Sequence, residues 1–245
     1  MQKFEQPPEA RRHLGGSTLK VYERIRSLII SHRFSAGEKI NQTVLARELN
    51  VSRTPVTHAL HKLETQGLVD HLPEKGFYVH QLSILELLDL FVLREAIDMI
   101  IAAEMVDSIT DDQCEQLEGI FRSYFHAGQV REEEVPEYFE ADSRFHRLLL
   151  DFSTNKLAKR VDDHFQIFAR SFTAGLLRQP NETLQEHRQI IDALRARDRK
   201  RAVDCVVRHC AGTKNYLREV VERLKALGVD PATIPYNKLE ESRTA

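Results

Sequence analysis

The chain has 245 residues, of which 42% are hydrophobic and 29% are charged, an ordinary composition for a globular protein with a sizeable core. No apolar run reaches the ~20 residues that a membrane span needs, and the first residues lack the apolar core of a signal peptide, so we expect a cytoplasmic protein with no membrane partner. The net charge of −2 excludes a general electrostatic affinity of the whole chain for nucleic acid.

The charge is unevenly distributed along the chain. Residues 1–80 hold 12 Lys and Arg against 8 Asp and Glu, which leaves 23 against 29 in residues 81–245. The first part is therefore basic, at about +4, and the rest acidic, at about −6. This asymmetry favours contact with nucleic acid through the first part alone.

Three helices are predicted near the N-terminus. Residues 1–16 contain two prolines and a Gly-Gly pair, which indicates a flexible arm. Ser17 can cap a first helix that runs to about residue 31. Asn41 caps a short second helix, and Ser52 begins a third that ends near Gly67.

A small hairpin follows the third helix. Residues 68–72 and 77–79 are short β-prone runs, joined by Pro73-Glu74-Lys75-Gly76. The stretch FSAGEKI, between the first two helices, is expected to be only a turn. Three helices followed by a hairpin predict a winged helix-turn-helix domain over residues 17–80.

The remainder of the chain has helical periodicity throughout. Ser83 with Glu86, and Thr110 with Gln113, fit capping boxes. Short connections and no strand signal indicate a six-helix antiparallel bundle over residues 84–227, so the fold class is mainly α. The tail, residues 228–245, is expected to be partly disordered. The six helices are predicted at 83–107, 110–126, 133–152, 155–178, 182–196 and 198–227.

The third helix is the candidate DNA reader, because the second helix of a helix-turn-helix lies in the major groove with its N-terminal residues facing the bases. Arg53 can contact guanine or phosphate, and Thr54 can do either. The alternative is a small protein-interaction domain in which Arg53 is an ordinary surface residue. Further candidates on this helix and on the wing are Thr57, His58, His61, Lys62, Lys75 and Gly76.

A polar pair interrupts the apolar face of the third bundle helix. Asp142 and His146 are four residues apart, on the same face as Phe145. His187 and His209 lie on apolar faces of two later helices. One carboxylate oxygen and three imidazole nitrogens form a donor set for a divalent transition metal, Zn²⁺ in the first place, or Ni²⁺ or Mn²⁺.

Simpler interpretations of these residues stay open. Histidines on apolar faces are commonly core residues with satisfied hydrogen bonds, and Asp142 could simply bond His146. His164 also faces inward by its pattern, so periodicity does not separate it from the proposed ligands.

A bound metal would leave coordination positions open for a ligand oxygen, and an acidic ligand would want cations or hydrogen-bond donors beside the metal. Arg94 is the best candidate for an inward-facing arginine. It could equally form an ordinary surface pair with Glu95 or Asp98. Weaker candidates for such a pocket are Arg170, Asn215 and Tyr216.

The first domain resembles a known family. Residues 45–79, LARELNVSRTPVTHALHKLETQGLVDHLPEKGFYV, are similar to the winged-helix domain of GntR-family bacterial transcription regulators, whose pattern reads roughly LA..L.VSRTPVREAL..LE..GLV.....KGF.V. The resemblance implies that Arg53 and Thr54 contact DNA and that Gly76 marks the wing tip. Where the family pattern has an Arg-Glu pair, this sequence has Thr57-His58. The operator sequence of relatives therefore does not predict the operator of this protein.

The second domain resembles the FCD effector domain of the FadR subfamily. Many members carry an Asp-x3-His on one helix and single histidines on two later helices, which correspond to Asp142, His146, His187 and His209. The resemblance implies a metal in the bundle core and a small carboxylate effector that completes its coordination. Relatives that bind acyl-CoA lack this metal set, which argues against that effector class.

Together these features predict a homodimeric transcription regulator, repressor or activator, whose binding to double-stranded operator DNA is controlled by a small organic acid. Two alternatives are a regulator with a metal-free effector pocket and a metal-dependent hydrolase. The hydrolase is disfavoured because no general base stands out and the HExxH pattern is absent.

Overall fold

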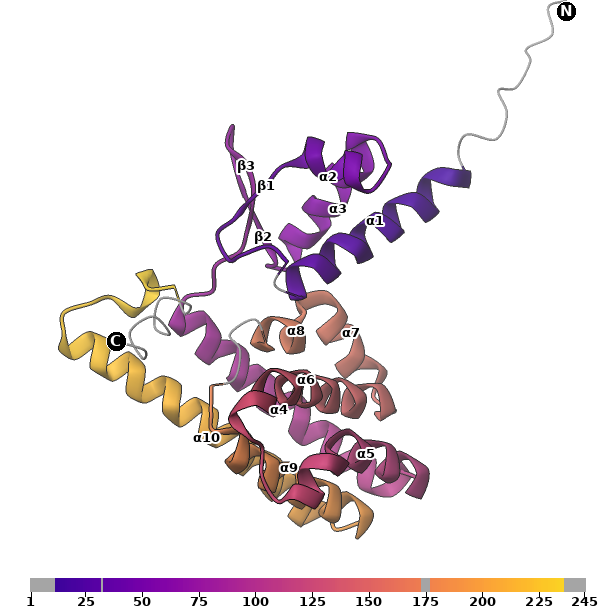
Figure 1. Cartoon of the computed structure of the whole chain (residues 1–245), viewed down its shortest axis with the longest axis vertical. Coiled ribbons are helices and arrows are strands. Elements are labelled where there is room, and N and C mark those ends of the chain that lie inside the picture. The colour runs from indigo at the N-terminus through magenta and orange to yellow at the C-terminus, as the bar shows by residue number, and fades with distance from the viewer. Residues whose placement is uncertain (1–11, 32, 173–176, 236–245) are drawn as a thin grey trace, which may run out of the picture. The chain divides into compact units, whose positions relative to one another are not determined.

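The computed structural model describes residues 12–31, 33–172 and 177–235 (Figure 1). The chain divides into two compact units between Gln81 and Leu82. We call the described residues before this boundary the head and those after it the body. The head combines helices with a small sheet and the body is helical, which confirms the mainly α fold class with a winged helix-turn-helix.

The head packs three helices against one face of a three-stranded antiparallel sheet with strand order β1-β3-β2. Its core contains Ile25, Val56, Leu60 and Phe77, each at most 2% exposed. The elements are α1 (Arg12–Ile30), β1 (Lys39–Ile40), α2 (Gln42–Glu48), α3 (Arg53–Thr65), β2 (Val69–Leu72) and β3 (Gly76–Val79).

Two of the helix starts are those predicted, and one is not. The Asn41 side chain accepts hydrogen bonds from two backbone amides at the start of α2, and Ser52 has the extended backbone of an N-cap. α1 instead begins at Arg12, before Ser17, so residues 12–16 are helical rather than part of a flexible arm. Glycine lowers helix propensity, but it does not prevent a helix whose later turns are stabilised by packing. Residues 1–11 of the predicted arm lie outside the described residues.

The predicted hairpin is confirmed, and a third strand joins it. Val69 pairs with Val79, and Leu72 with Gly76, across β2 and β3. The turn predicted at FSAGEKI contains β1, whose Ile40 pairs with Phe77 of β3. A two-residue strand is defined only by its hydrogen bonds to a distant partner, so local sequence could not predict it.

The body is a helical bundle in which α4 and α9 pack along α10, and α5 packs against α9 (Figure 1). The predicted capping boxes at Ser83 and Thr110 are both present. The elements are α4 (Ile84–Ser108), α5 (Asp111–Ala127), the 3-10 turn η1 (Glu132–Glu134), α6 (Val135–Phe152), α7 (Lys156–Phe165), α8 (Ile167–Phe172), α9 (Pro180–Arg195), α10 (Arg199–Ala226) and the 3-10 turn η2 (Pro231–Thr233).

The helix predicted at 155–178 is two helices, α7 and α8. The break is at Gln166, which has a left-handed backbone with φ of 52°. Glycine is the usual residue there, so the sequence carries no stop signal at this position. Residues 173–176 lie outside the described residues.

The C-terminal tail is described as far as residue 235. η2 belongs to it, and a β-bridge joins Pro235 to Ser83. Residues 236–245 lie outside the described part. Within the described ranges, no helix is both long and apolar enough to cross a membrane.

Candidate metal centre and nucleic-acid interface

Four buried side chains from three helices meet inside the body. Asp142 and His146 come from α6, His187 from α9 and His209 from α10. One ligand atom from each lies within 4.8 Å of the others. The structure therefore brings together the four residues proposed from the sequence as metal ligands.

The distances within this cluster suit one shared ion. Nε2 of His146 lies 3.1 Å from Nε2 of His209, and Nε2 of His187 lies 2.9 Å from Oδ1 of Asp142. Oδ1 of Asp142 is also 3.8 Å from Nε2 of His146. Bonds of about 2.1 Å to a metal place neighbouring ligand atoms about 3.0–3.4 Å apart. The observed spacings bracket that range.

Two of the four inner atoms are otherwise unsatisfied. Asp142 Oδ1 and His187 Nε2 are buried and make no hydrogen bond to any described residue, because they are not aligned for one despite their short separation. A buried polar atom without a partner is costly. A cation between the two atoms would satisfy both, so the donor set fits a metal ion.

The outer nitrogens of two histidines are held by hydrogen bonds. Nδ1 of His209 lies 2.8 Å from Oε2 of Glu186, and Nδ1 of His187 lies 3.3 Å from the Tyr138 hydroxyl. Tyr138 is in turn 2.8 Å from the Thr183 hydroxyl. Such partners fix the orientation of a ligating imidazole and direct its other nitrogen to the metal.

Arg178 extends one of these contacts outward. Its guanidinium donates to both carboxylate oxygens of Glu186, at 2.7 and 2.9 Å, and to Glu182 at 3.1 Å. A β-carbon at Gly212 would overlap this guanidinium, so glycine lets it lie against α10. The result is a chain of contacts from Arg178 through Glu186 to His209.

Burial and neighbouring groups set the protonation of the cluster. Burial lowers the pKa of His146 well below its usual value and that of His209 to about 4. Burial acts to raise the pKa of the Asp142 carboxyl, but the adjacent His187 outweighs it and the pKa is lowered. Neutral imidazoles and a charged carboxylate are the forms that bind metal.

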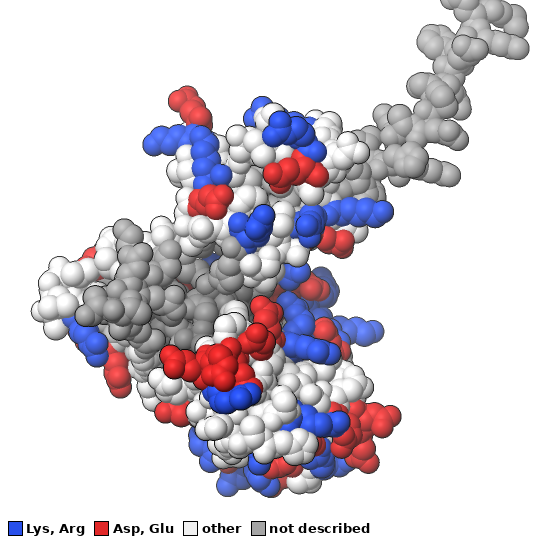
Figure 2. All heavy atoms as spheres, in the orientation of Figure 1, with Lys and Arg blue, Asp and Glu red and all other residues white. Residues whose placement is uncertain are grey.

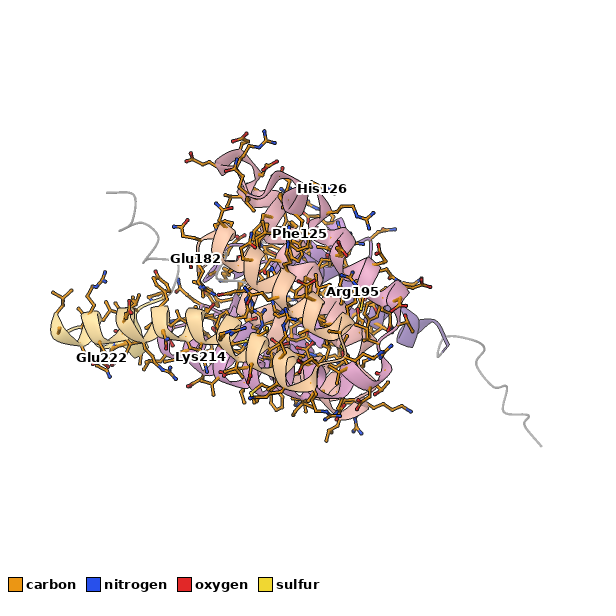
Figure 3. All side chains as sticks on the ribbon, turned by 90° about the horizontal axis from the view of Figure 1, so that it is seen from below. Phe125, His126, Glu182, Arg195, Lys214 and Glu222 are labelled. Carbon is orange, nitrogen blue, oxygen red and sulfur yellow. The ribbon has the colours of Figure 1, made fainter. Side chains whose placement is uncertain are left out.

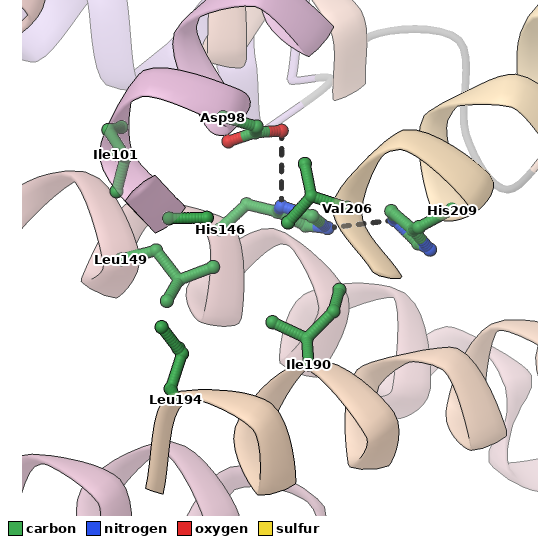
Figure 4. A pocket seen from close by; sticks show the side chains of 9 residues that line it. Asp98, Ile101, His146, Leu149, Ile190, Leu194, Val206 and His209 are labelled. Atoms are coloured by element: carbon green, nitrogen blue, oxygen red, sulfur yellow. Dashed lines mark hydrogen bonds and ion pairs between the residues drawn. The ribbon is translucent and has the colours of Figure 1, made fainter. Parts of the chain in front are cut away.

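Arg94 faces inward, as the sequence suggested, and is also paired with Asp98. Its Nε is 3.5 Å from Asp98 Oδ2, both side chains are 3% exposed, and it donates to Ser171. Burial raises the pKa of Asp98 to about 6, although Arg94 acts in the opposite direction. Asp98 also lies 3.8 Å from Nδ1 of His146 (Figure 4). The pair therefore adjoins the cluster.

A cavity of about 10 Å³ borders the cluster, roughly the room that one water molecule needs. His146, His209 and Asp98 are on its wall, and the other lining residues are apolar (Figure 4). Asn215 is exposed and, with Tyr216, lines a separate open groove of about 700 Å³. Arg170 is half-buried on α8. Of the arginines proposed for the effector, Arg94 is therefore the one shown beside the cluster.

The remaining body histidines lie apart from this cluster. His164 is exposed and packs edge-on against Phe165, so its predicted inward orientation is wrong. The buried residues of short α7 are Ala158 and Asp162, and Asp162 pairs with Arg147 at 3.1 Å. His126 is exposed, at the edge of the bundle (Figure 3).

The start of α3 presents the predicted DNA-reading residues to solvent. Arg53, Thr54 and His58 are exposed. Arg53 Nε donates to Gln42 of α2 at 2.7 Å, which ties the two helices of the motif together. Thr57 donates its hydroxyl to the Arg53 carbonyl oxygen, so this hydroxyl is already engaged within the helix.

The wing carries the other candidates. Lys75 is exposed, and Gly76 has φ of 93° with open space around it, a backbone that other residues rarely adopt. The Lys62 ammonium lies 4.0 Å from the ring centre of Tyr22 on α1. Figure 2 shows Lys and Arg side chains over the head, interspersed with acidic groups.

Two family matches cover most of the chain. Residues 17–79 match "Bacterial regulatory proteins, gntR family", and residues 89–212 match the FCD domain. The chain belongs to the GntR family and carries an FCD domain. As a GntR regulator with an FCD domain, it is a DNA-binding transcriptional regulator rather than an enzyme.

Its relatives agree with this assignment. It is 26% identical to the HTH-type transcriptional repressor RspR of Escherichia coli, over 82% of this chain and 89% of that protein. It is also 26% identical to the uncharacterised HTH-type regulator YdhC of Bacillus subtilis, over 84% and 93%. The solved structure of E. coli McbR/YncC has the same fold, with 17% identity, a TM-score of 0.67 and coverage of 83% of this chain and 97% of that one.

Proposed function

We propose that this GntR regulator binds one divalent transition metal ion, in the first place Zn²⁺, through Asp142, His146, His187 and His209. The observation that carries the proposal is the convergence of three imidazole Nε2 atoms and a carboxylate oxygen, two of them without a hydrogen bond among the described residues. The outer contacts of the histidines support it, because they are typical of metal ligands.

The bound ion would anchor a small organic acid that controls operator binding. Four protein ligands leave a coordination position open on an ion that accepts five or six, and a carboxylate oxygen suits it. Arg94 supplies a guanidinium beside the site and could exchange Asp98 for the carboxylate of the acid. The cavity that borders the cluster has a volume of only about 10 Å³, so the body must open before an effector can enter. Effector binding would therefore favour a second, more open arrangement of the body.

We also propose that the regulator acts as a homodimer on a near-palindromic operator, since two-fold symmetry of a protein is matched by that of its site. Arg53 and Thr54 of α3 would contact bases or phosphates, with His58 on the same exposed face. Lys75 and Gly76 would bring the wing to the DNA backbone.

Elemental analysis of the untagged protein tests the metal site. We expect about one transition metal ion per chain in the wild type and none in the His146→Ala, His187→Ala double variant, with circular dichroism to check that it folds. The absence of metal in both proteins, even after reloading, would favour the metal-free effector pocket instead.

Fluorescence anisotropy with DNA from upstream of the regulator's own gene tests the head. Arg53→Ala should weaken binding by about 1–3 kcal/mol, because it removes a contact to base or phosphate. Arg122→Ala, which removes an exposed arginine of the body, is the matched control and should bind as the wild type does. Equal binding by all three proteins would refute the assignment of Arg53.

A further inference from the structure

A second group of side chains that could ligate a metal lies in the head, and the proposed metal site of the body does not include it. His61 and Glu64 come from α3 and His71 from β2. One ligand atom from each of the three lies within 4.8 Å of the others. His61 and His71 are exposed and Glu64 is partly buried, so solvent reaches the group.

The fold places these three residues on facing surfaces. His61 and Glu64 are three residues apart on one face of α3, where Nδ1 of His61 lies 2.9 Å from Oε2 of Glu64. His71 pairs directly with Phe77 across the hairpin and follows buried Val69 by two residues. It therefore extends the face of the sheet that covers the head core and α3.

Phe77 holds both imidazole rings in place. Its ring, 2% exposed, stacks on His71 with centroids 4.4 Å apart and meets His61 edge-on at 4.9 Å. The two imidazoles are 5.2 Å apart and nearly perpendicular to each other. Both rings are therefore largely ordered before any ligand arrives, which lowers the entropic cost of binding.

We propose that His61, Glu64 and His71 bind a second divalent cation of borderline softness, Zn²⁺, Ni²⁺ or Cu²⁺, with water in the remaining positions. Two imidazoles and one carboxylate are an established donor set for such ions, with bonds of about 2.1 Å. The three ligand atoms would need to move only slightly closer together to bind one ion. Because the site is exposed, the ion exchanges readily with the solution.

This ion would link the recognition helix to the wing. α3 begins with Arg53, and β2 leads into the turn that carries Lys75, directly before Gly76 at the start of β3. A cation that bridges His61 and Glu64 to His71 fixes the position of α3 relative to that hairpin. DNA binding by the head would then respond to the concentration of free metal, independently of the ion in the body.

Equilibrium dialysis of the full-length protein against Zn²⁺, after the tightest-binding ion has been loaded, tests the proposal. We expect the wild type to take up one further Zn²⁺ per chain. His71→Gln should lower the affinity for that further ion by more than about tenfold. His58→Gln, which changes an exposed histidine on α3 outside the group, should leave it unchanged.

A second protein separates this site from the one in the body. His187→Ala removes a body ligand, so it should still bind the head ion, and adding His71→Gln should abolish that binding. His61→Gln should act as His71→Gln does. The proposal is overturned if the wild type takes up no further Zn²⁺, or if His71→Gln binds it as tightly as His58→Gln does.

Discussion

Glu186 connects the surface of the body to the proposed metal site. Burial acts to raise its pKa, but His209 and Arg178 outweigh burial and lower the pKa to about 2. The side chain is therefore a carboxylate at neutral pH and accepts a hydrogen bond from Nδ1–H of His209. That bond leaves the lone pair on Nε2, the nitrogen that faces the other ligands.

Glu186→Gln should lower the affinity for the metal by about 10- to 100-fold, the usual effect of losing a hydrogen-bond partner of a ligand. A neutral amide still fills the space but no longer selects the required tautomer of His209. Competition against a chromophoric chelator measures the change.

Glu182→Gln is the matched control, since Glu182 also binds Arg178 but has no contact with His209 in the described structure. It should leave the affinity within about twofold. Equal losses in both variants would mean that the charge near Arg178 matters rather than the bond to His209.

The sequence indicated which polar side chains converge inside the body, but it did not indicate their hydrogen-bond partners. Asp142 and His146 could be recognised because polar residues on an apolar helix face need an explanation. Glu186 is adjacent to His187 in sequence but contacts His209 on another helix, and Tyr138 reads as an ordinary core aromatic. Such contacts depend on how the helices pack against one another, and the hydrophobic periodicity of a single sequence does not specify that packing.

At the scale of helices, replacing glycine by alanine is expected to affect stability differently at two positions. Gly119 lies within α5 with open space around its α-carbon, whereas a β-carbon at Gly212 of α10 would overlap the Arg178 guanidinium. Glycine in a helix interior costs about 1 kcal/mol relative to alanine. Gly119→Ala should therefore raise the free energy of unfolding of the body by about that amount.

Gly212→Ala should give no such gain, because Arg178 must leave Glu186 to make room for the methyl group. Thermal unfolding of the two variants, followed by circular dichroism in the presence of chelator, measures the difference. If both alanines stabilise equally, Arg178 moves aside at no cost and its contact with α10 is unimportant.

Element prediction succeeded where the signal was local. The caps at Asn41, Ser83 and Thr110 were identified from their own residues and are present. β1 exists only through its pairing with β3, and the break at Gln166 occurs in a residue that rarely adopts this backbone. The inward orientation predicted for His164 failed with that break, because the helix assumed around it ends at Phe165.

At the scale of the whole chain, the basic first part and the acidic second part correspond to two units with different tasks. The head holds the residues proposed to contact DNA, and the body holds the buried cluster. An effector in the body changes operator binding only if it binds two arrangements of the protein with different affinity. A dimer is the simplest assembly that turns a change in the body into a change in the spacing of two heads.

The outer face of α4 is the strongest candidate for the dimer interface. Val92, Leu93 and Ile100 lie on one side of this helix and are 46–53% exposed, while its opposite side is in the bundle core. A group of exposed apolar side chains on one face of a helix commonly marks an interaction surface. We therefore expect a second copy of the chain to cover this face.

Ile100→Asp should convert the proposed dimer into monomers, because a carboxylate in an apolar interface is left without a partner. Sedimentation velocity at micromolar concentration measures the change. Operator affinity should fall with it, since two linked heads bind far more tightly than one. Leu157→Asp places the same charge on α7 at a side chain that is 66% exposed, and should remain dimeric. A dimeric Ile100→Asp protein would exclude this face of α4 as the interface.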